Sequence, residues 1–284
     1  MSETPLFGPA GRADSFETMG FRDMEQVPEY LSRFGLEAYE YQCGRGVRVN
    51  AKTLAAMRKN AETFPVQYSI HAPYFISMSS LEEDKRIGSV RYVLESAAAL
   101  RQLGGKRIIF HSGSCGKQSR EAALALATDT MRLFVAAMDE GGYGDMTLCP
   151  EVMGKINQLG TLDEVLTLCS VDRRITPCVD FGHLNARTHG SLRTKADFAA
   201  VLDRMAEVLD DDRAVHFHAH FSKIEYTEGG EKQHLTFEDT LYGPQYEPLM
   251  ELLAQRGLAP TIICESSGTQ TEDAAAMRQY YRSL

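Results

Sequence analysis

Short apolar runs of strand length alternate along this chain with longer stretches of helix length. The runs are rich in β-branched and aromatic residues, which is typical of buried strands. The predicted strands span residues 4–7, 38–42, 66–71, 107–110, 146–149, 176–179, 214–219 and 261–264. The predicted helices span residues 26–34, 51–63, 81–103, 119–140, 162–170, 195–209, 246–256 and 272–282.

Several predicted helix boundaries carry residues that commonly start or stop helices. Gly104 and Gly105 follow a long predicted helix and favour a C-terminal cap there. Thr161 and Glu164 have the spacing of a capping box, in which the hydroxyl accepts from a backbone N–H three residues on and the carboxylate reaches back. Thr194 is expected to cap the helix over residues 195–209.

The order of these elements predicts the fold class. Eight strand–helix units in strict alternation favour a parallel sheet. A length of 284 residues suits one α/β domain over residues 1–284, a (β/α)8 TIM barrel. A doubly wound open sheet is the alternative, but it would bind ligands at a single switch point. Here six separate strand ends carry candidate ligands, and only a closed ring brings them together.

Histidine and acidic residues recur where the predicted strands end. A single one of them is more often a core histidine or a helix N-cap, but their joint placement on one rim favours a shared metal site. Imidazoles and carboxylates without thiolates suit Zn²⁺, with Mn²⁺ or Fe²⁺ as alternatives. So many ligands suit two or three ions, an arrangement that commonly drives phosphate ester hydrolysis. The residues are His71, His111, Glu151, Asp180, His183, His218 and Glu265.

Three histidines alternate along the seventh predicted strand. His216, His218 and His220 share one strand face because side chains alternate with period two. They would occupy successive layers inside a barrel, so at most one or two of them reach the metals. His216 would lie deepest and is expected to have a structural role.

Composition says more about the cellular compartment of the protein than about its activity. The net charge of −9 argues against a broad nucleic-acid-binding surface, although a local basic rim including Arg45 is compatible with it. No stretch approaches the roughly 20 apolar residues of a membrane span. The six cysteines are scattered and form no Cys-x-x-Cys motif, so we expect a reducing, cytoplasmic setting.

Taken together, the motifs at the strand ends resemble one known family. They are His71-Ala-Pro-Tyr74, His111-Ser-Gly-Ser, Glu151 with the glycine-containing segment after it, Asp180-Phe-Gly-His183, His218-Ala-His-Phe-Ser-Lys223 and Ile-Ile-Cys-Glu265. In this order, over nearly the whole chain, they are similar to the endonuclease IV family. This family comprises metal-dependent apurinic/apyrimidinic endonucleases among the xylose isomerase-like TIM barrels.

The resemblance implies a ligand set for each of three zinc ions. The first set is His71, His111 and Glu151; the second is Glu151, Asp180, His218 and Glu265; the third is His183 with a later Asp-x-His segment that ends at His234.

The resemblance also implies a mechanism. Glu151, Asp180 and Glu265 would act in catalysis, with Glu151 bridging metals and orienting or deprotonating water. Hydroxide generated on the metals would attack the phosphorus without a protein nucleophile. Tyr74 would contact DNA near the lesion, and we assign His220 and Arg45 to substrate binding as well.

The sequence departs from the family pattern in two places. Lys232 stands where an aspartate should precede His234. The third site is therefore empty, or it uses His220 or Glu231 in place of the aspartate. The first strand reads Phe7-Gly-Pro-Ala-Gly11 and lacks the histidine usual in the family. These differences indicate a divergent branch.

Three functions compete at this stage. The first is cleavage of duplex DNA 5′ to abasic sites in DNA repair. The alternative is a divalent-metal sugar isomerase or epimerase of the same superfamily, acting on a small sugar. A barrel that binds metal without catalysis is the third, and no sequence feature supports it directly. A closed barrel needs no partner, so we expect a monomer without membrane association.

Overall fold

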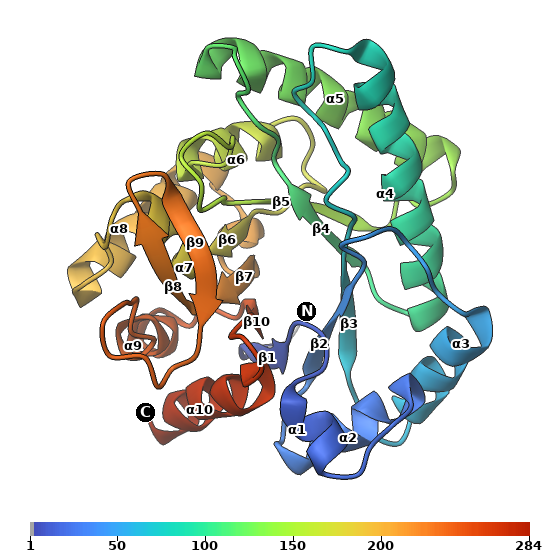
Figure 1. Cartoon of the computed structure of the whole chain (residues 1–284), viewed down its shortest axis with the longest axis vertical. Helices are drawn as coiled ribbons and strands as arrows, with labels where there is room; N and C mark the ends of the chain where they lie inside the picture. The colour runs from blue at the N-terminus through green and yellow to red at the C-terminus, as the bar shows by residue number, and fades with distance from the viewer. Residues whose placement is uncertain (1–2) are drawn as a thin grey trace.

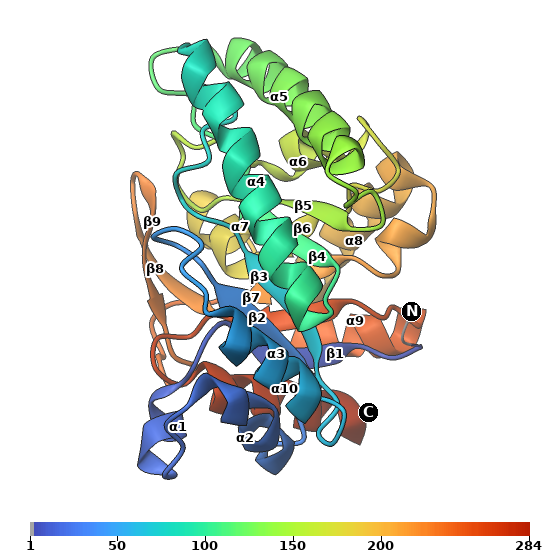
Figure 2. The ribbon, with the colours of Figure 1, turned by 90° about the vertical axis from the view of Figure 1, so that its right-hand side faces the viewer.

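Eight parallel strands form a barrel at the centre of the molecule, with helices around it (Figures 1 and 2). The computed structural model describes residues 3–284. Neighbouring strands follow the order β1-β10-β7-β6-β5-β4-β3-β2. The strands are β1 Leu6–Pro9, β2 Ala38–Gln42, β3 Gln67–His71, β4 Arg107–His111, β5 Thr147–Glu151, β6 Cys178–Asp180, β7 His218–Phe221 and β10 Thr261–Cys264. The predicted fold class, a single α/β TIM barrel, is confirmed.

The ring closes where β1 meets β2. The amide of Gly11 donates to the carbonyl of Glu40 at 3.0 Å, and the amide of Glu37 donates to the carbonyl of Phe7 at 3.1 Å. The two backbones approach so closely that a Cβ on Gly8 would lie 1.8 Å from the Ala38 carbonyl oxygen. Glycine is therefore required at position 8 for contact between two strands, and not for approach to a ligand.

Helices cover the outside of the barrel. Figure 2 shows the two longest helices, α4 and α5, running alongside each other over β3, β4 and β5. The helices are α1 Asp14–Thr18, η1 Met24–Gln26, α2 Val27–Arg33, α3 Ala51–Asn60, α4 Glu83–Leu103, α5 Arg120–Glu140, α6 Leu162–Cys169, α7 Phe181–Arg187, α8 Lys195–Leu209, η2 Asp212–Ala214, α9 Glu247–Arg256 and α10 Gln270–Ser283. No helix within residues 3–284 is both long and apolar enough to cross a membrane.

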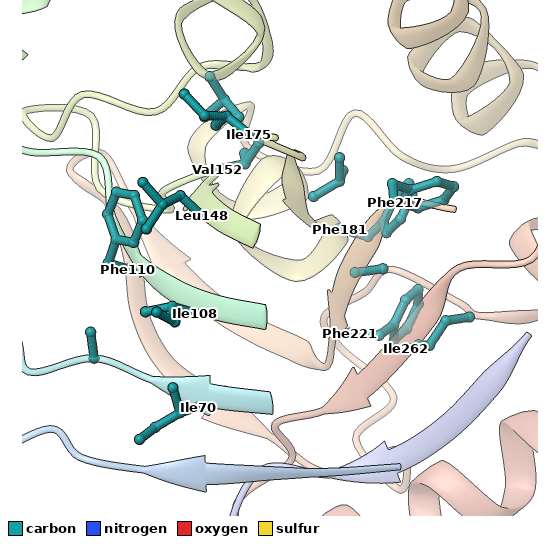
Figure 3. Close-up of a cluster of buried hydrophobic side chains, with 14 of the residues drawn as sticks. Ile70, Ile108, Phe110, Leu148, Val152, Ile175, Phe181, Phe217, Phe221 and Ile262 are labelled. Carbon is teal, nitrogen blue, oxygen red and sulfur yellow. The ribbon is translucent and has the colours of Figure 1, made fainter. Parts of the chain in front are cut away.

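The hydrophobic core lies between the strands and the surrounding helices. Figure 3 shows Ile70, Phe110 and Phe217 pointing away from the barrel axis, and all three are buried. Their neighbours in the strands point inward, because side chains alternate across a strand. Polar side chains such as His71 and Glu151 are thereby left to the barrel interior.

The sequence located all eight barrel strands, although some bounds shifted. The first strand is Leu6–Pro9 instead of 4–7, and the seventh is His218–Phe221 instead of 214–219, because η2 occupies Asp212–Ala214. The capping box of Thr161 and Glu164 is present, and Gly104 ends α4 with φ of 84°.

Besides α1 and the short η turns, two elements near the carboxyl ends of the strands were not predicted. One is α7, which begins directly after Asp180. The other is an antiparallel hairpin of β8 Lys223–Thr227 and β9 Gly230–Leu235. Figure 2 shows this hairpin at the edge of the molecule near α7, against which it packs.

Candidate metal centre

A pocket of about 460 Å³ opens at the carboxyl ends of the barrel strands. It collects side chains from the ends of β3, β4 and β5, from α7, from β9 and from the residue after β10. In a barrel of parallel strands this rim is where the loops that follow the strands build a site. The lining residues are His71, Tyr74, His111, Glu151, Met153, Lys155, Gln158, His183, Glu231, His234 and Glu265.

The first predicted ligand set comes together around one oxygen of Glu151. Nε2 of His71 lies 3.2 Å from Glu151 Oε2, and Nε2 of His111 lies 3.7 Å from the same oxygen. Nδ1 of His71 donates to the Ala72 carbonyl at 2.9 Å, which assigns a ring proton to Nδ1 and makes Nε2 the nitrogen that could bind a metal. His71, His111 and Glu151 could therefore hold one ion.

The second set forms around the other oxygen of Glu151, with one correction. Nδ1 of His220 lies 3.1 Å from Glu151 Oε1 and 3.6 Å from Glu265 Oε2. Ligand atoms of Glu151, Asp180, His220 and Glu265 all lie within 4.8 Å of one another.

His218, the expected histidine of this set, lies one layer deeper in the barrel. Its Nε2 is 2.9 Å from Glu40, and the structure groups it with Cys178 and His220 instead of with Glu151, Asp180 and Glu265. His220, which we had assigned to substrate binding, takes its place.

The third set is complete without an aspartate before His234. Nδ1 of His183 donates to the Val152 carbonyl at 3.1 Å, while its Nε2 lies 3.4 Å from Glu231 Oε2. His183, Glu231 and His234 could together hold an ion.

Lys232 does not take part in the third set. Its exposed ammonium group pairs with Glu225 at 2.6 Å, on the outer side of the hairpin. Gly154 allows Glu231 to approach, since a Cβ at position 154 would lie 2.5 Å from the Glu231 Cβ.

Charge in the centre is concentrated on Glu151. Burial opposes ionisation, but hydrogen bonds from His183, His220 and His71 hold the pKa of Glu151 well below its usual value. Burial raises the pKa of Glu265, although the charge of His220 counteracts this. Burial lowers the pKa of His111 to about 3, so its imidazole is neutral and able to bind a metal at neutral pH.

The donor set fits a metal ion. Asp180 Oδ1 caps α7 by accepting from the His183 amide at 2.7 Å, whereas the buried Oδ2 has no hydrogen-bond partner in residues 3–284 and lies 3.0 Å from Nδ1 of His183. A buried carboxylate oxygen without a donor is costly unless a cation compensates it. Within the same residues only one cysteine, Cys178, lies near these groups, and burial raises the pKa of its thiol well above the usual range. The centre is therefore built from imidazoles and carboxylates, which suit Zn²⁺, Mn²⁺ or Fe²⁺.

The remaining predicted residues lie at the rim or outside it. Tyr74 is 57% exposed, and its ring stacks on His111 with centroids 4.9 Å apart. Arg45 is exposed and does not line the pocket, although its neighbour Gly44 accepts from the Tyr74 amide at 3.2 Å. As expected for the deepest histidine of its strand, His216 lines a different cavity, at the opposite end of the barrel.

The sequence did not identify Glu40, an acidic residue of the barrel interior. It also left open whether Glu231 or His220 replaces the missing aspartate. Glu40 lies in the middle of β2 and away from any strand end, so the signal used to find ligands did not reach it. The only hint was a charged residue inside an otherwise apolar strand. Glu231 was one of two possible substitutes for the missing aspartate, and the register of the β8–β9 hairpin selects it.

Comparison with known proteins places the chain among TIM barrels of one family. Residues 18–284 match the family described as xylose isomerase-like TIM barrel. An uncharacterised protein of Methanocaldococcus jannaschii, MJ0133, is 29% identical over 97% of this chain and 96% of its own length. The Probable endonuclease 4 of Malacoplasma penetrans is 27% identical, over 55% of this chain and 53% of that protein.

Solved structures share the fold at lower sequence identity. Endonuclease IV from Thermus thermophilus superposes with a TM-score of 0.69 at 17% identity, covering 99% of this chain and 100% of that one. A D-tagatose 3-epimerase-like protein gives a TM-score of 0.70 at 16% identity, covering 98% and 97%. Matching over residues 18–284 establishes that the chain belongs to the xylose isomerase-like TIM barrel family.

Proposed function

We propose that this protein is a metal-dependent phosphodiesterase that cleaves duplex DNA 5′ to abasic sites. One observation carries the proposal: three ligand sets converge on a single pocket, and Glu151 belongs to the first two. A polynuclear centre of this type suits in-line displacement at phosphorus, where charge develops on both the attacking and the leaving oxygen.

The bound ions would supply Lewis acidity and a lowered pKa for a coordinated water. The protein supplies their spacing. Glu151 turns Oε2 toward His71 and His111 and Oε1 toward His220 and His183, so its two oxygens serve opposite sides of the centre. We assign Glu151 the bridging role and Asp180 and Glu265 the role of holding the ion beside it.

Binding of the substrate would fall to the rim of the pocket. Tyr74 offers an exposed aromatic face beside the first ligand set, and Lys155 adds a positive charge to the lining. A flipped or unstacked nucleotide can stack on such a ring. The partner in this proposal is duplex DNA, and the similarity to the Probable endonuclease 4 of Malacoplasma penetrans supports it.

We place this activity in a monomer that acts in the cytoplasm. All six cysteines are buried free thiols, as expected for a reducing compartment.

A sugar isomerase or epimerase is the second candidate. The observation in its favour is the second ligand set, because two glutamates, an aspartate and His220 suffice to hold one ion. The fold match to a D-tagatose 3-epimerase-like protein supports it as well. The first and third sets would then have no assigned role, which makes this the weaker proposal.

The test is strand cleavage of a short duplex that contains one abasic site. We expect a nick 5′ to that site, loss of activity with chelator and recovery with added Zn²⁺. An intact duplex of the same sequence is the control. Metal-loaded protein that leaves abasic DNA whole but interconverts aldoses and ketoses would establish the second candidate instead.

A further inference from the structure

A buried carboxylate lies directly beneath the metal centre. Glu40 is fully buried in the middle of β2 and has contacts at both of its oxygens. Oε1 accepts from Gln42 Nε2 at 3.2 Å, and Oε2 accepts from Ser69 Oγ at 2.9 Å. Both of these partners come from β2 or its neighbour β3 and hold the carboxylate in place from its own side of the barrel.

From this position Glu40 reaches across the barrel interior to β7. His218 Nε2 lies 2.9 Å from Oε2, and His220 Nε2 lies 3.1 Å from Oε1. Oε2 thus has a hydrogen bond on each side of the barrel, whereas Oε1 has one on its own side and faces Nε2 of His220, which makes no aligned hydrogen bond in residues 3–284.

His220 has carboxylates beside both of its ring nitrogens. Nε2 faces Glu40, while Nδ1 faces Glu151 at 3.1 Å and Glu265 at 3.6 Å. Cys178 also lies beside the ring, and burial raises the pKa of its thiol well above the usual range. A metal-binding imidazole is usually oriented in this way, by an acceptor at the nitrogen that does not bind the metal.

We propose that Glu40 is the positioning residue that turns Nδ1 of His220 toward the ion held with Glu151, Asp180 and Glu265. The inference rests on the proposed function in requiring that this set binds metal. The register of β7 brings His220 and not His218 to the centre, and the contacts with Glu40 fix the orientation of both rings.

A role in packing alone would not explain a buried carboxylate at position 40. Burying a charged group costs several kcal/mol per ion, and well-packed apolar residues often replace a buried ion pair without loss of stability. A carboxylate whose role was only to fill the interior would be easy to replace. A carboxylate that orients a ligand would not be, because the apolar substitute leaves the ring free to turn.

The inference also predicts a spectroscopic signature. His71 and His183 keep their protons on Nδ1, through the carbonyls of Ala72 and Val152, and offer Nε2 to a metal. His220 would do the reverse, with the proton on Nε2 and the metal on Nδ1. One histidine of the opposite coordination type should therefore be visible in the ¹⁵N spectrum of the zinc-loaded protein.

The test compares zinc affinity in four variants of the full chain by competition with a chromophoric chelator. Glu40→Gln keeps the shape without the charge, and Glu40→Asp keeps the charge with a shorter reach. We expect each to weaken zinc binding about 10- to 100-fold, the usual effect of losing such a partner. Glu37→Gln is the matched control, because Glu37 lies just before β2 and pairs with Arg278 on α10, far from the metals. Its zinc affinity should equal that of the wild type.

Ser69→Ala is the fourth variant and guards against misfolding. It leaves the carboxylate in place but removes one donor to Oε2, so we expect a smaller loss of zinc affinity in the same direction. Thermal melting of each metal-free variant shows whether the fold survives. If Glu40→Gln does not fold, the Ser69→Ala affinity and its ¹⁵N spectrum decide.

The outcomes separate this inference from the proposed function. Weaker zinc binding together with loss of the Nδ1-coordinated histidine signal in Glu40→Gln would support the role of Glu40. Wild-type affinity and an unchanged spectrum in both Glu40 variants would overturn that role and leave the proposed function standing. A wild-type protein that binds no zinc at all would overturn the proposed function itself.

Discussion

The two ends of the barrel have cavities of similar size but opposite chemistry. The carboxyl end holds about 460 Å³ lined by histidines and acids, and the amino end holds about 430 Å³ lined by arginines. At the amino end Arg174 pairs with Asp139 and Asp172, and Arg213 pairs with Asp211.

The two ends differ in the partners of their charged side chains. The guanidinium of Arg107, also at the amino end, donates to the carbonyls of His216 and Phe217. At the carboxyl end Asp180 Oδ2 has no donor in residues 3–284, and four ligand atoms crowd within 4.8 Å. Volume alone would not distinguish the ends, whereas the carboxylates and imidazoles gathered within ligand distance of one another point to the carboxyl end as the place where an ion could bind.

The largest expected effect comes from Glu151→Gln. This change removes the negative charge shared by the first and second ligand sets. We expect zinc affinity and DNA cleavage to fall more than about 100-fold, beyond the usual effect of an outer-shell change. Metal content by mass spectrometry and a nicking assay measure both, and full activity in this variant would exclude the bridging role.

Lowering the pH should also weaken metal binding. Burial alone would lower the pKa of His71, but its hydrogen bond to Glu151 and the charge of that group raise it. In the metal-free protein His71 therefore stays protonated to a higher pH than an ordinary histidine. A metal that binds its Nε2 must displace this proton. Each proton released weakens binding about tenfold per pH unit of acidification below that pKa.

Calorimetry of zinc binding in buffers of different ionisation enthalpy measures this release. We expect zinc binding to release protons, in growing number as the pH is lowered toward the raised pKa of His71. Binding enthalpies that do not vary with the buffer would contradict the raised pKa of His71.

At the amino end, Arg107→Leu should affect stability and not metal binding. The change removes a donor from the carbonyls of His216 and Phe217, of which Phe217 still accepts from the Thr261 amide, at a cost of about 1–3 kcal/mol. Denaturant unfolding of the metal-free protein measures this cost. Zinc affinity should stay within about twofold of the wild type, and a large loss of affinity would mean that the two ends are coupled.

The smallest effect separates Glu231 from Lys232. We expect Glu231→Gln to weaken occupancy of the third set about tenfold, because one of its three ligands loses its charge. Lys232→Gln is the matched control on the same strand, since Lys232 points away and pairs with Glu225. Zinc titration should show one weakened site in the first variant and none in the second.

Local pattern was enough to predict the barrel. Strand composition located all eight strands, and the spacing of Thr161 and Glu164 located a capping box that the structure contains. These features depend on neighbours within a few residues, which a sequence displays directly.

What local pattern missed depends on long-range register. The period of two put His218 and His220 on one face, but only the pairing of β7 with β6 and β10 sets which one reaches the rim. Glu40 acquires its role from β7, which lies 178 residues further along the chain. The β8–β9 hairpin was missed because β9, Gly-Glu-Lys-Gln-His-Leu, contains no apolar run of the kind that marks the barrel strands.

The most direct test of the proposed metal centre is the number of ions that the protein binds and the residues that hold them. Anomalous diffraction at the zinc edge on crystals of the zinc-loaded protein gives both. We expect two or three ions, with Glu151 bridging two of them and His220 bound through Nδ1. A single ion held by Glu151, Asp180, His220 and Glu265 would contradict it and favour the sugar isomerase.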